Sequence, residues 1–204
     1  MPLILEVLLA LGLAGAFAGA VQVWRRSLAT GRREDLRALA ARRGWSLTVT
    51  GGRLGRAGTL RLASRGGHAF AVEVRSDADG GLVTEYEADS PRWSEGRLVA
   101  ALAVGPEEPR AQRMLAAEVA RAAQSLPSLP SADGLLLFAD ADPGRRVILH
   151  DLARALGGWT VPGRPVLTLS PDGLRLRLRQ SLDRADRMER FVDLAFDLSR
   201  VIGP

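Results

Sequence analysis

Two aspartates, Asp140 and Asp142, occupy the position in this chain that most resembles a chemical site. They follow an apolar run of strand length and precede a predicted helix over residues 142–157. In doubly wound enzymes, carboxylates at such a strand end often bind magnesium or act in catalysis. The competing interpretation is structural, because Asp142 before Pro143 is a typical helix N-cap and Asp140 can simply end the strand. We therefore keep Asp140 and Asp142 as candidate catalytic residues, with capping as the alternative.

The histidine and cysteine content argues against metal chemistry. The chain has two histidines, His68 and His150, and no cysteine. Neither histidine has a second ligand at the helical spacing of a zinc protease, and thiolate sites are excluded. No Gly-x-Ser-x-Gly motif of a serine hydrolase occurs either. The sequence therefore predicts no metal and no cofactor, and it leaves the question of enzymatic activity open while favouring a function without catalysis.

Two segments alternate charged with uncharged residues, which is typical of strands with one polar face. The acidic members are Glu85, Glu87 and Asp89, and the basic members are Arg175, Arg177 and Arg179. Pairing of these strands within the domain would satisfy the charges internally, whereas a partner-binding face would leave them exposed. The sequence argues against nucleic-acid binding, because aromatic residues make up only 5% of the chain and none lies within the basic strand.

The composition is that of a globular domain from a GC-rich, bacterial type of coding sequence. The chain has 204 residues, 47% of them hydrophobic, and all 28 of its basic residues are arginine. Because arginine replaces lysine throughout, the sequence pI of about 11.1 overstates a formal net charge of only +5. Such a chain is long enough to bury a sizeable core.

The first 24 residues read as a transmembrane anchor. The run from Val7 to Val21 contains no charged residue, and Glu6 and Trp24 flank it as residues suited to the headgroup region. A helix of this length is roughly 27 Å long, about the hydrocarbon thickness of a bilayer. The alternatives are a cleaved signal peptide, with a secreted domain that begins near Val21, and a buried helix of a soluble core.

Arginines follow the anchor but do not precede it, which predicts an external N-terminus and a cytoplasmic domain in the inner (cell) membrane. Those next to the anchor are Arg25, Arg26, Arg32, Arg33 and Arg37. We interpret them as basic residues that face anionic lipid headgroups, with an ordinary solvated face as the alternative. Within the anchor, Gly15 and Gly19 form a small-xxx-small pair that could pack two helices into a homodimer. Composition alone also produces such pairs in a chain rich in glycine and alanine.

The remaining pattern predicts an α+β fold in which short helices cover antiparallel sheet. A basic juxtamembrane helix occupies residues 25–44, a first α+β lobe residues 45–126, and a second lobe residues 127–204, unless the two lobes form one continuous domain. The predicted helices cover residues 31–43, 110–125, 142–157 and 182–201, and the predicted strands cover residues 45–50, 59–65, 69–75, 82–89, 97–104, 134–140, 165–170 and 174–179.

These observations favour a non-enzymatic interaction or scaffolding module on a single-pass membrane anchor, with a protein partner that the sequence does not identify. The alternative is a membrane-anchored enzyme or a binder of small, phosphate-type ligands that uses the strand-end carboxylates with nearby arginine.

Overall fold

The computed structural model describes residues 30–50, 58–64, 66, 68–89, 93, 95–130, 134–140 and 147–202. The predicted anchor over residues 1–24, with Gly15 and Gly19, lies outside these residues, as do Arg25, Arg26 and Asp142. Among the helices that the structure describes, none combines the length and the apolar character needed to cross a membrane.

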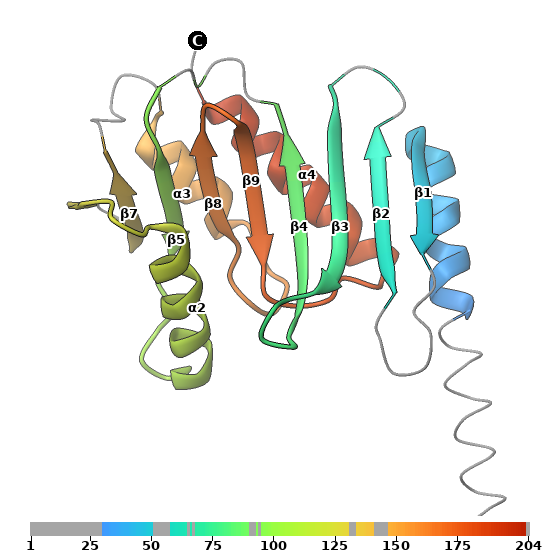
Figure 1. Ribbon diagram of the computed structural model, residues 1–204, viewed down its shortest axis with the longest axis horizontal. Coiled ribbons are helices and arrows are strands. Elements are labelled where there is room, and N and C mark those ends of the chain that lie inside the picture. The colour runs from blue at the N-terminus through green and yellow to red at the C-terminus, as the bar shows by residue number, and fades with distance from the viewer. Residues whose placement is uncertain are drawn as a thin grey trace, which may run out of the picture.

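Nine antiparallel strands form one sheet (Figure 1). In chain order they are β1 (Trp45–Thr50), β2 (Thr59–Ser64), β3 (Phe70–Ser76), β4 (Leu82–Ala88), β5 (Leu98–Leu102), β6 (Ser128–Leu129), β7 (Leu135–Ala139), β8 (Val166–Ser170) and β9 (Gly173–Leu178). Their order across the sheet is β1-β2-β3-β4-β9-β8-β5-β7-β6. Strands from both sequence lobes thus alternate, since β9 lies between β4 and β8, and β5 lies between β8 and β7.

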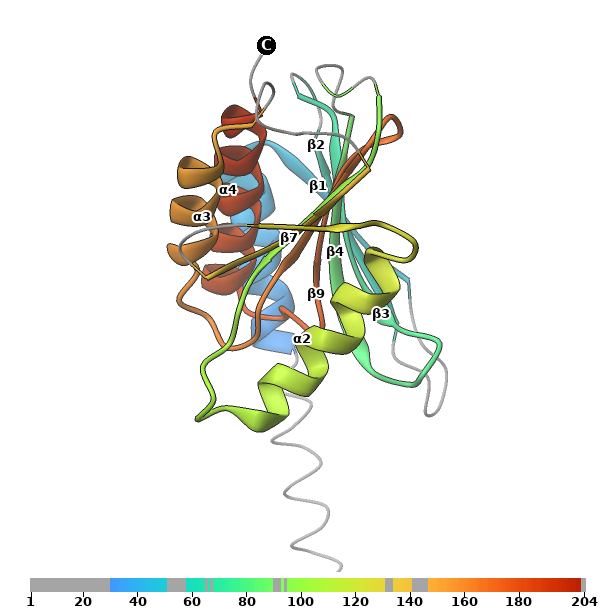
Figure 2. The same cartoon turned by 90° about the vertical axis from the view of Figure 1, so that its left-hand side faces the viewer.

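Four helices accompany the sheet within the described residues. They are a first helix over residues 30–43, α2 (Pro109–Ala122), α3 (Leu149–Gly157) and α4 (Ala185–Val201). The first helix, α3 and α4 lie on one face of the sheet, and α2 lies on the other (Figure 2). The α+β class and the antiparallel sheet are therefore confirmed.

Period-two alternation explains why the sheet has one apolar and one polar face. In β9 the side chains of Leu174, Leu176 and Leu178 are buried toward the three helices, whereas Arg175 and Arg177 point to the opposite face. The strand registers continue this pattern, because Leu176 pairs with Tyr86 of β4 and with Leu167 of β8 on the apolar side.

The main hydrophobic core lies between this apolar face and the three helices. Leu36 and Leu39 of the first helix, Leu152 of α3 and Phe191 of α4 are all almost fully buried in it. A smaller second core on the other face joins Leu115, Val119 and Ala123 of the α2 segment to Val99, Ala101 and Val166 of the sheet. Burial of one large aliphatic side chain in such a core stabilises the fold by about 1.5 to 3 kcal/mol.

Ion pairs also connect the first helix to α4. Arg43 Nε lies 2.8 Å from Glu189 Oε1, and Arg43 Nη2 lies 3.0 Å from Asp193 Oδ2. The Arg43 guanidinium lies 5.7 Å from the centre of the Trp45 ring, at the start of β1. The predicted amphipathic helix over residues 31–43 is thus confirmed, and its charged end is fixed against the C-terminal helix.

The structure differs from the sequence prediction at two elements. The helix predicted from Asp142 begins instead at Leu149, after an extended Ile148 that makes no side-chain cap hydrogen bond. Val147, which fits the helical period, pairs in an antiparallel bridge with Ile202, so the backbone there is extended. Strand β6 was not predicted: it lies between the predicted helix over residues 110–125 and the predicted strand over residues 134–140, and its two residues pair with β7.

Candidate functional site on the uncovered sheet face

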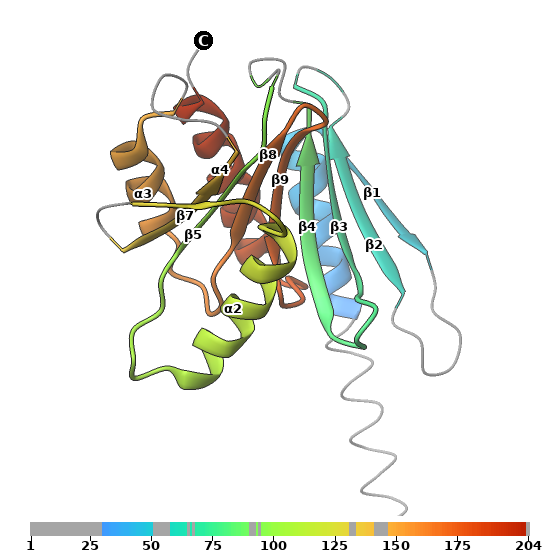
Figure 3. The same ribbon diagram turned by 60° about the vertical axis from the view of Figure 1, so that its left-hand side comes forward.

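The polar face of the sheet is only partly covered. Helix α2 lies over the β5 and β8 side of this face, while none of the described helices covers β1 to β4 there (Figure 3). The strand registers place outward-facing residues in rows that cross the sheet. One row runs through Arg61, Glu73, Glu85 and Arg177, and the next runs through Ala71, Glu87, Arg175 and Thr168. We call this surface the uncovered face.

Most charges on this face belong to one connected set of ion pairs, which we call the arginine–carboxylate network. Its members are Arg75, Arg121, Arg175, Arg177 and Arg179 with Asp77, Asp79, Glu85, Glu87 and Glu118. Five cations therefore face five carboxylates. The internal pairing of the acidic and basic strands, one of the two alternatives left open by the sequence, is what the structure contains.

Glu118 is the buried centre that joins α2 to this network. Its side chain is 6% exposed, and Glu118 Oε2 lies 2.8 Å from Arg177 Nε. Glu118 Oε1 accepts hydrogen bonds from Arg179 Nη1 at 3.1 Å and from Arg121 Nη1 at 2.9 Å. A carboxylate this deeply buried depends on its cations, because water reaches it poorly.

Glu85 has the same role within the sheet. Its side chain is 7% exposed and lies 2.7 Å from Arg75 Nη2 and 3.0 Å from Arg175 Nε. Since β3, β4 and β9 each contribute one of these three residues, the contacts connect three adjacent strands.

The β3–β4 turn completes the network through Asp77 and Asp79. The Asp77 carboxylate accepts a hydrogen bond from the Ala78 backbone N–H at 2.9 Å and one from Arg177 Nη2 at 2.6 Å. Asp79 accepts one from the Gly81 backbone N–H at 3.1 Å and also pairs with Arg179. The carboxylates thus stabilise a hairpin turn, the structure that the glycines at 80 and 81 favour.

Electrostatics in the network favour the charged forms. Burial alone raises the pKa of Asp77, but the Ala78 N–H and the guanidinium groups of Arg177 and Arg121 outweigh it and lower the pKa to about 2. Burial alone lowers the pKa of Arg177, but the hydrogen bond to Asp77 and the charges of Glu118 and Glu85 raise it above its ordinary value. Asp77 and Arg177 therefore both stay charged near neutral pH.

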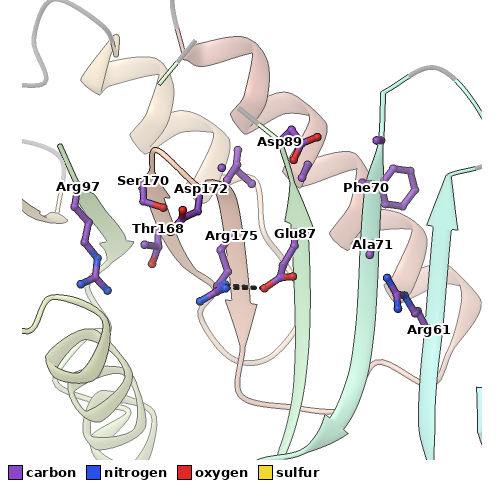
Figure 4. A pocket seen from close by; sticks show the side chains of 14 residues that line it. Arg61, Phe70, Ala71, Glu87, Asp89, Arg97, Thr168, Ser170, Asp172 and Arg175 are labelled. Atoms are coloured by element: carbon purple, nitrogen blue, oxygen red, sulfur yellow. Dashed lines mark hydrogen bonds and ion pairs between the residues drawn. The ribbon is translucent and has the colours of Figure 1, made fainter. Parts of the chain in front are cut away.

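Beside the network, the uncovered face forms a cavity of about 680 Å³ where β2, β3, β4, β9 and β8 end (Figure 4). Its charged lining residues are Arg61, Arg97, Arg175, Glu87, Asp89 and Asp172. We call it the upper cavity. Among its lining residues, Gly173 cannot carry a side chain, because its φ is +128° and a Cβ atom would lie 2.3 Å from the Ala88 carbonyl oxygen.

Arg97 enters the upper cavity from the start of β5. Its backbone N–H donates a hydrogen bond to Asp140 Oδ1 at 2.8 Å, and its carbonyl oxygen accepts one from the Asp140 N–H at 3.3 Å. The guanidinium group makes no ion pair within the described part of the chain. Thr168 and Ser170 of β8 line the same cavity, and their hydroxyls likewise make no hydrogen bond to a described residue.

The site residues that the sequence predicted and the structure describes do not belong to the network or line the upper cavity. Asp140 lies at the end of β7, exposed, with one carboxylate oxygen used by the Arg97 backbone, which fits the structural interpretation of this residue. Arg32 pairs with Asp183 ahead of α4, whereas Arg33 and Arg37 are exposed and make no ion pair with described residues. His68 packs against the Phe196 ring, and His150 is exposed on α3. No group of three or more possible metal ligands occurs in the described ranges.

No protein family, no curated protein and no solved structure matches this chain. The residues of the site therefore carry the functional argument by themselves.

Sequence reasoning missed Arg97, Thr168 and Ser170 as a group. Arg97 is one of 28 basic residues, and neither hydroxyl belongs to a motif. The available signal was indirect. The predicted strands over residues 165–170 and 174–179 are joined by Pro171, Asp172 and Gly173, a hairpin turn that places Ser170 near Arg175, but nothing local indicates that β5 pairs with β8.

Proposed function

We propose that this protein is a membrane-tethered interaction module that binds a protein partner on the uncovered face of its sheet. The observation that carries this proposal is the asymmetric covering of the sheet by the described helices: three of them bury one face, and none of them covers β1 to β4 on the other, beside a cavity of about 680 Å³. An antiparallel sheet can also leave one face to water. The cavity favours binding over simple solvation, because recognition sites are concave and largely preformed.

The ion pairs support a recognition role of a particular kind. Glu85 and Glu118 are held by arginines in fixed positions, so the charge pattern of the face is preorganised. Preorganised charges favour specificity and the rate of association more than they favour affinity. A partner would therefore meet a rigid surface of matched charges, with the upper cavity as the place for an anchoring group.

The tether proposal rests on the sequence of residues 1–24 and on the direction of the first helix. That helix starts at the same end of the sheet as the β3–β4 turn and runs alongside the strands (Figure 1). An anchor ahead of it would hold the strands roughly along the bilayer normal, with the uncovered face directed sideways and accessible. Arg33 and Arg37, exposed and without ion pairs to described residues, would join Arg25 and Arg26 near anionic headgroups.

Topology tests the tether. We expect a C-terminal fusion to a reporter active only in the cytoplasm to give signal, and a fusion to a reporter active only outside to give none, because the arginines follow the apolar run. The mature chain should keep its full mass of 21.8 kDa in the membrane fraction. A shortened chain or an external domain would overturn the tether and favour the secreted alternative.

Site-specific photo-crosslinking tests the docking face. A photoreactive residue in place of Thr48 or Ala71, both directed to the uncovered face, should give one discrete crosslinked product in intact cells. The same residue in place of Arg154, on the exposed side of α3, is the control and should not give that product. No product from either face position in a folded, membrane-bound chain, or equal products from all three, would contradict the proposal.

A second candidate function is the binding of a small anionic ligand, which the upper cavity also favours. In this case the ligand would meet Arg97 and the β8 hydroxyls rather than the strand-end carboxylate, because Asp140 already binds the Arg97 backbone.

A further inference from the structure

Arg97 lines the upper cavity with a guanidinium group that makes no ion pair to a described residue. By contrast, the cations of the arginine–carboxylate network all have carboxylate partners. Both polar atoms of the Arg97 backbone are bonded to Asp140, so the start of its side chain is held in place.

Strand register places two hydroxyl-bearing residues, Ser170 and Thr168, beside Arg97 on the same face of the sheet. Leu98 pairs with Leu169 and Val99 pairs with Thr168, so Arg97 and Ser170 come next to each other at the ends of β5 and β8. Side chains at such opposed positions lie about 5 Å apart at Cβ. Arg97, Thr168 and Ser170 face the same cavity (Figure 4), and together they supply the five N–H donors of a guanidinium and two O–H donors.

The balance of charge around the cavity limits what can bind. Arg175 lies 2.8 Å from Glu87 and 3.0 Å from Glu85, and Arg61 lies 3.6 Å from Glu73, so Arg97 is the one lining cation without an ion pair to a described residue. Asp89 and Asp172 line the cavity as well. Because Asp89 and Asp172 repel any anion, a singly charged carboxylate meets less repulsion beside Arg97 than a doubly charged phosphate does.

We propose that Arg97, Ser170 and Thr168 form a receptor for one carboxylate group, supplied by an acidic side chain or the C-terminus of the partner protein. A carboxylate matches the guanidinium fork with two parallel hydrogen bonds, and the hydroxyls can satisfy its remaining lone pairs. The source of the carboxylate rests on the proposed function, but the site itself is testable with a small anion alone.

The test uses the full chain, labelled with ¹⁵N and held in detergent micelles, with sodium acetate as the probe. At constant ionic strength, acetate should shift the Arg97 Nε–H resonance and the backbone amides of Thr168 and Ser170 along a saturable curve. Inorganic phosphate at the same ionic strength should bind at least tenfold more weakly. Arg97→Gln should weaken acetate binding at least tenfold, since a hydrogen bond to a charged group is lost.

The matched control is Arg113→Gln, which changes an exposed arginine of α2 outside the cavity and should leave acetate binding unchanged. Ser170→Ala should weaken acetate about threefold and serves as the second variant if Arg97→Gln does not fold. No saturable shift, equal shifts with chloride, or a preference for phosphate would overturn the carboxylate receptor. If acetate does not bind while crosslinking from the uncovered face persists, the docking proposal stands and the carboxylate receptor is wrong. If acetate binds while no crosslink forms, the carboxylate receptor stands and the docking proposal is wrong.

Discussion

Replacement of Glu118 by alanine is expected to lower the free energy of unfolding by about 3 kcal/mol, the largest effect we expect from a single charged residue. The Glu118 side chain is buried and contacts Arg177, Arg179 and Arg121. Without it, Arg177, itself only 18% exposed, loses one of its carboxylates, and α2 loses its polar attachment to the sheet. Denaturant unfolding of the chain measures the loss, and hydrogen exchange should show α2 opening first.

Two comparisons separate the buried ion pair from a general effect of charge removal. Glu73→Ala removes a half-exposed carboxylate that lies 3.6 Å from Arg61, so it should cost no more than about 1 kcal/mol. Glu118→Gln should cost less than Glu118→Ala, because the amide oxygen can still accept a hydrogen bond from Arg179 or Arg121. A cost for Glu118→Ala as small as that for Glu73→Ala would show that the network does not hold α2 in place.

The sequence pattern of α2 is enough to predict that Glu118 is buried, but not all of the residues that it contacts. Leu115, Glu118 and Val119 fall on one stripe at the helical period, so a helix that buries the two apolar residues must also bury the carboxylate between them. Arg121, three residues along the same helix, is a partner that the helical period predicts. The contacts with Arg177 and Arg179 are not predictable from a local pattern, because these residues lie far along the chain, with a separation of 61 residues between Glu118 and Arg179.

The same limit applies to the whole sheet. Alternation predicted most strands to within a residue or two, and it predicted correctly which residues of β9 face outward. It did not predict that β4 pairs with β9, which brings Glu87 opposite Arg175 although 88 residues separate them. Register between distant strands depends on the complementary fit of whole faces, and a local pattern carries no information about it.

The upper cavity depends on that long-range pairing more than any other feature. Arg97 and Thr168 come from β5 and β8, which have no common local signal, and Gly173 is needed only because the Ala88 carbonyl of β4 lies against it. The sequence therefore identified Asp140, at a strand end. The lining cation without an ion pair to a described residue is instead Arg97, whose backbone N–H donates a hydrogen bond to Asp140. Strand-end position alone is a weak guide when the sheet is antiparallel, because Asp and Asn also end strands for backbone reasons.

Acidification is expected to weaken the fold through Asp77. Its folded pKa of about 2 lies below the model-peptide value of 3.8, so its stabilising contribution is present above pH 4 and is lost as the pH falls toward 2. Burial opposes this shift, and the Ala78 N–H with Arg177 and Arg121 produces it. A shift of nearly two pH units corresponds to about 2 kcal/mol. Asp77→Asn should therefore flatten the loss of unfolding free energy between pH 5 and pH 2 by that amount.

Asp193 provides a comparison of opposite sign. Burial raises the pKa of this carboxyl despite the nearby Arg43. Protonation of Asp193 therefore favours the folded protein, and its contribution to stability grows as the pH falls. Asp193→Asn removes that gain and should make the acid loss steeper, while Asp77→Asn makes it shallower. Denaturant unfolding of both variants at a series of pH values decides the matter. If the free energy of unfolding falls equally with pH in the two variants, the Asp77 contacts with Arg177 and Arg121 do not persist in solution. The β3–β4 turn would then not be held against α2 by these ion pairs.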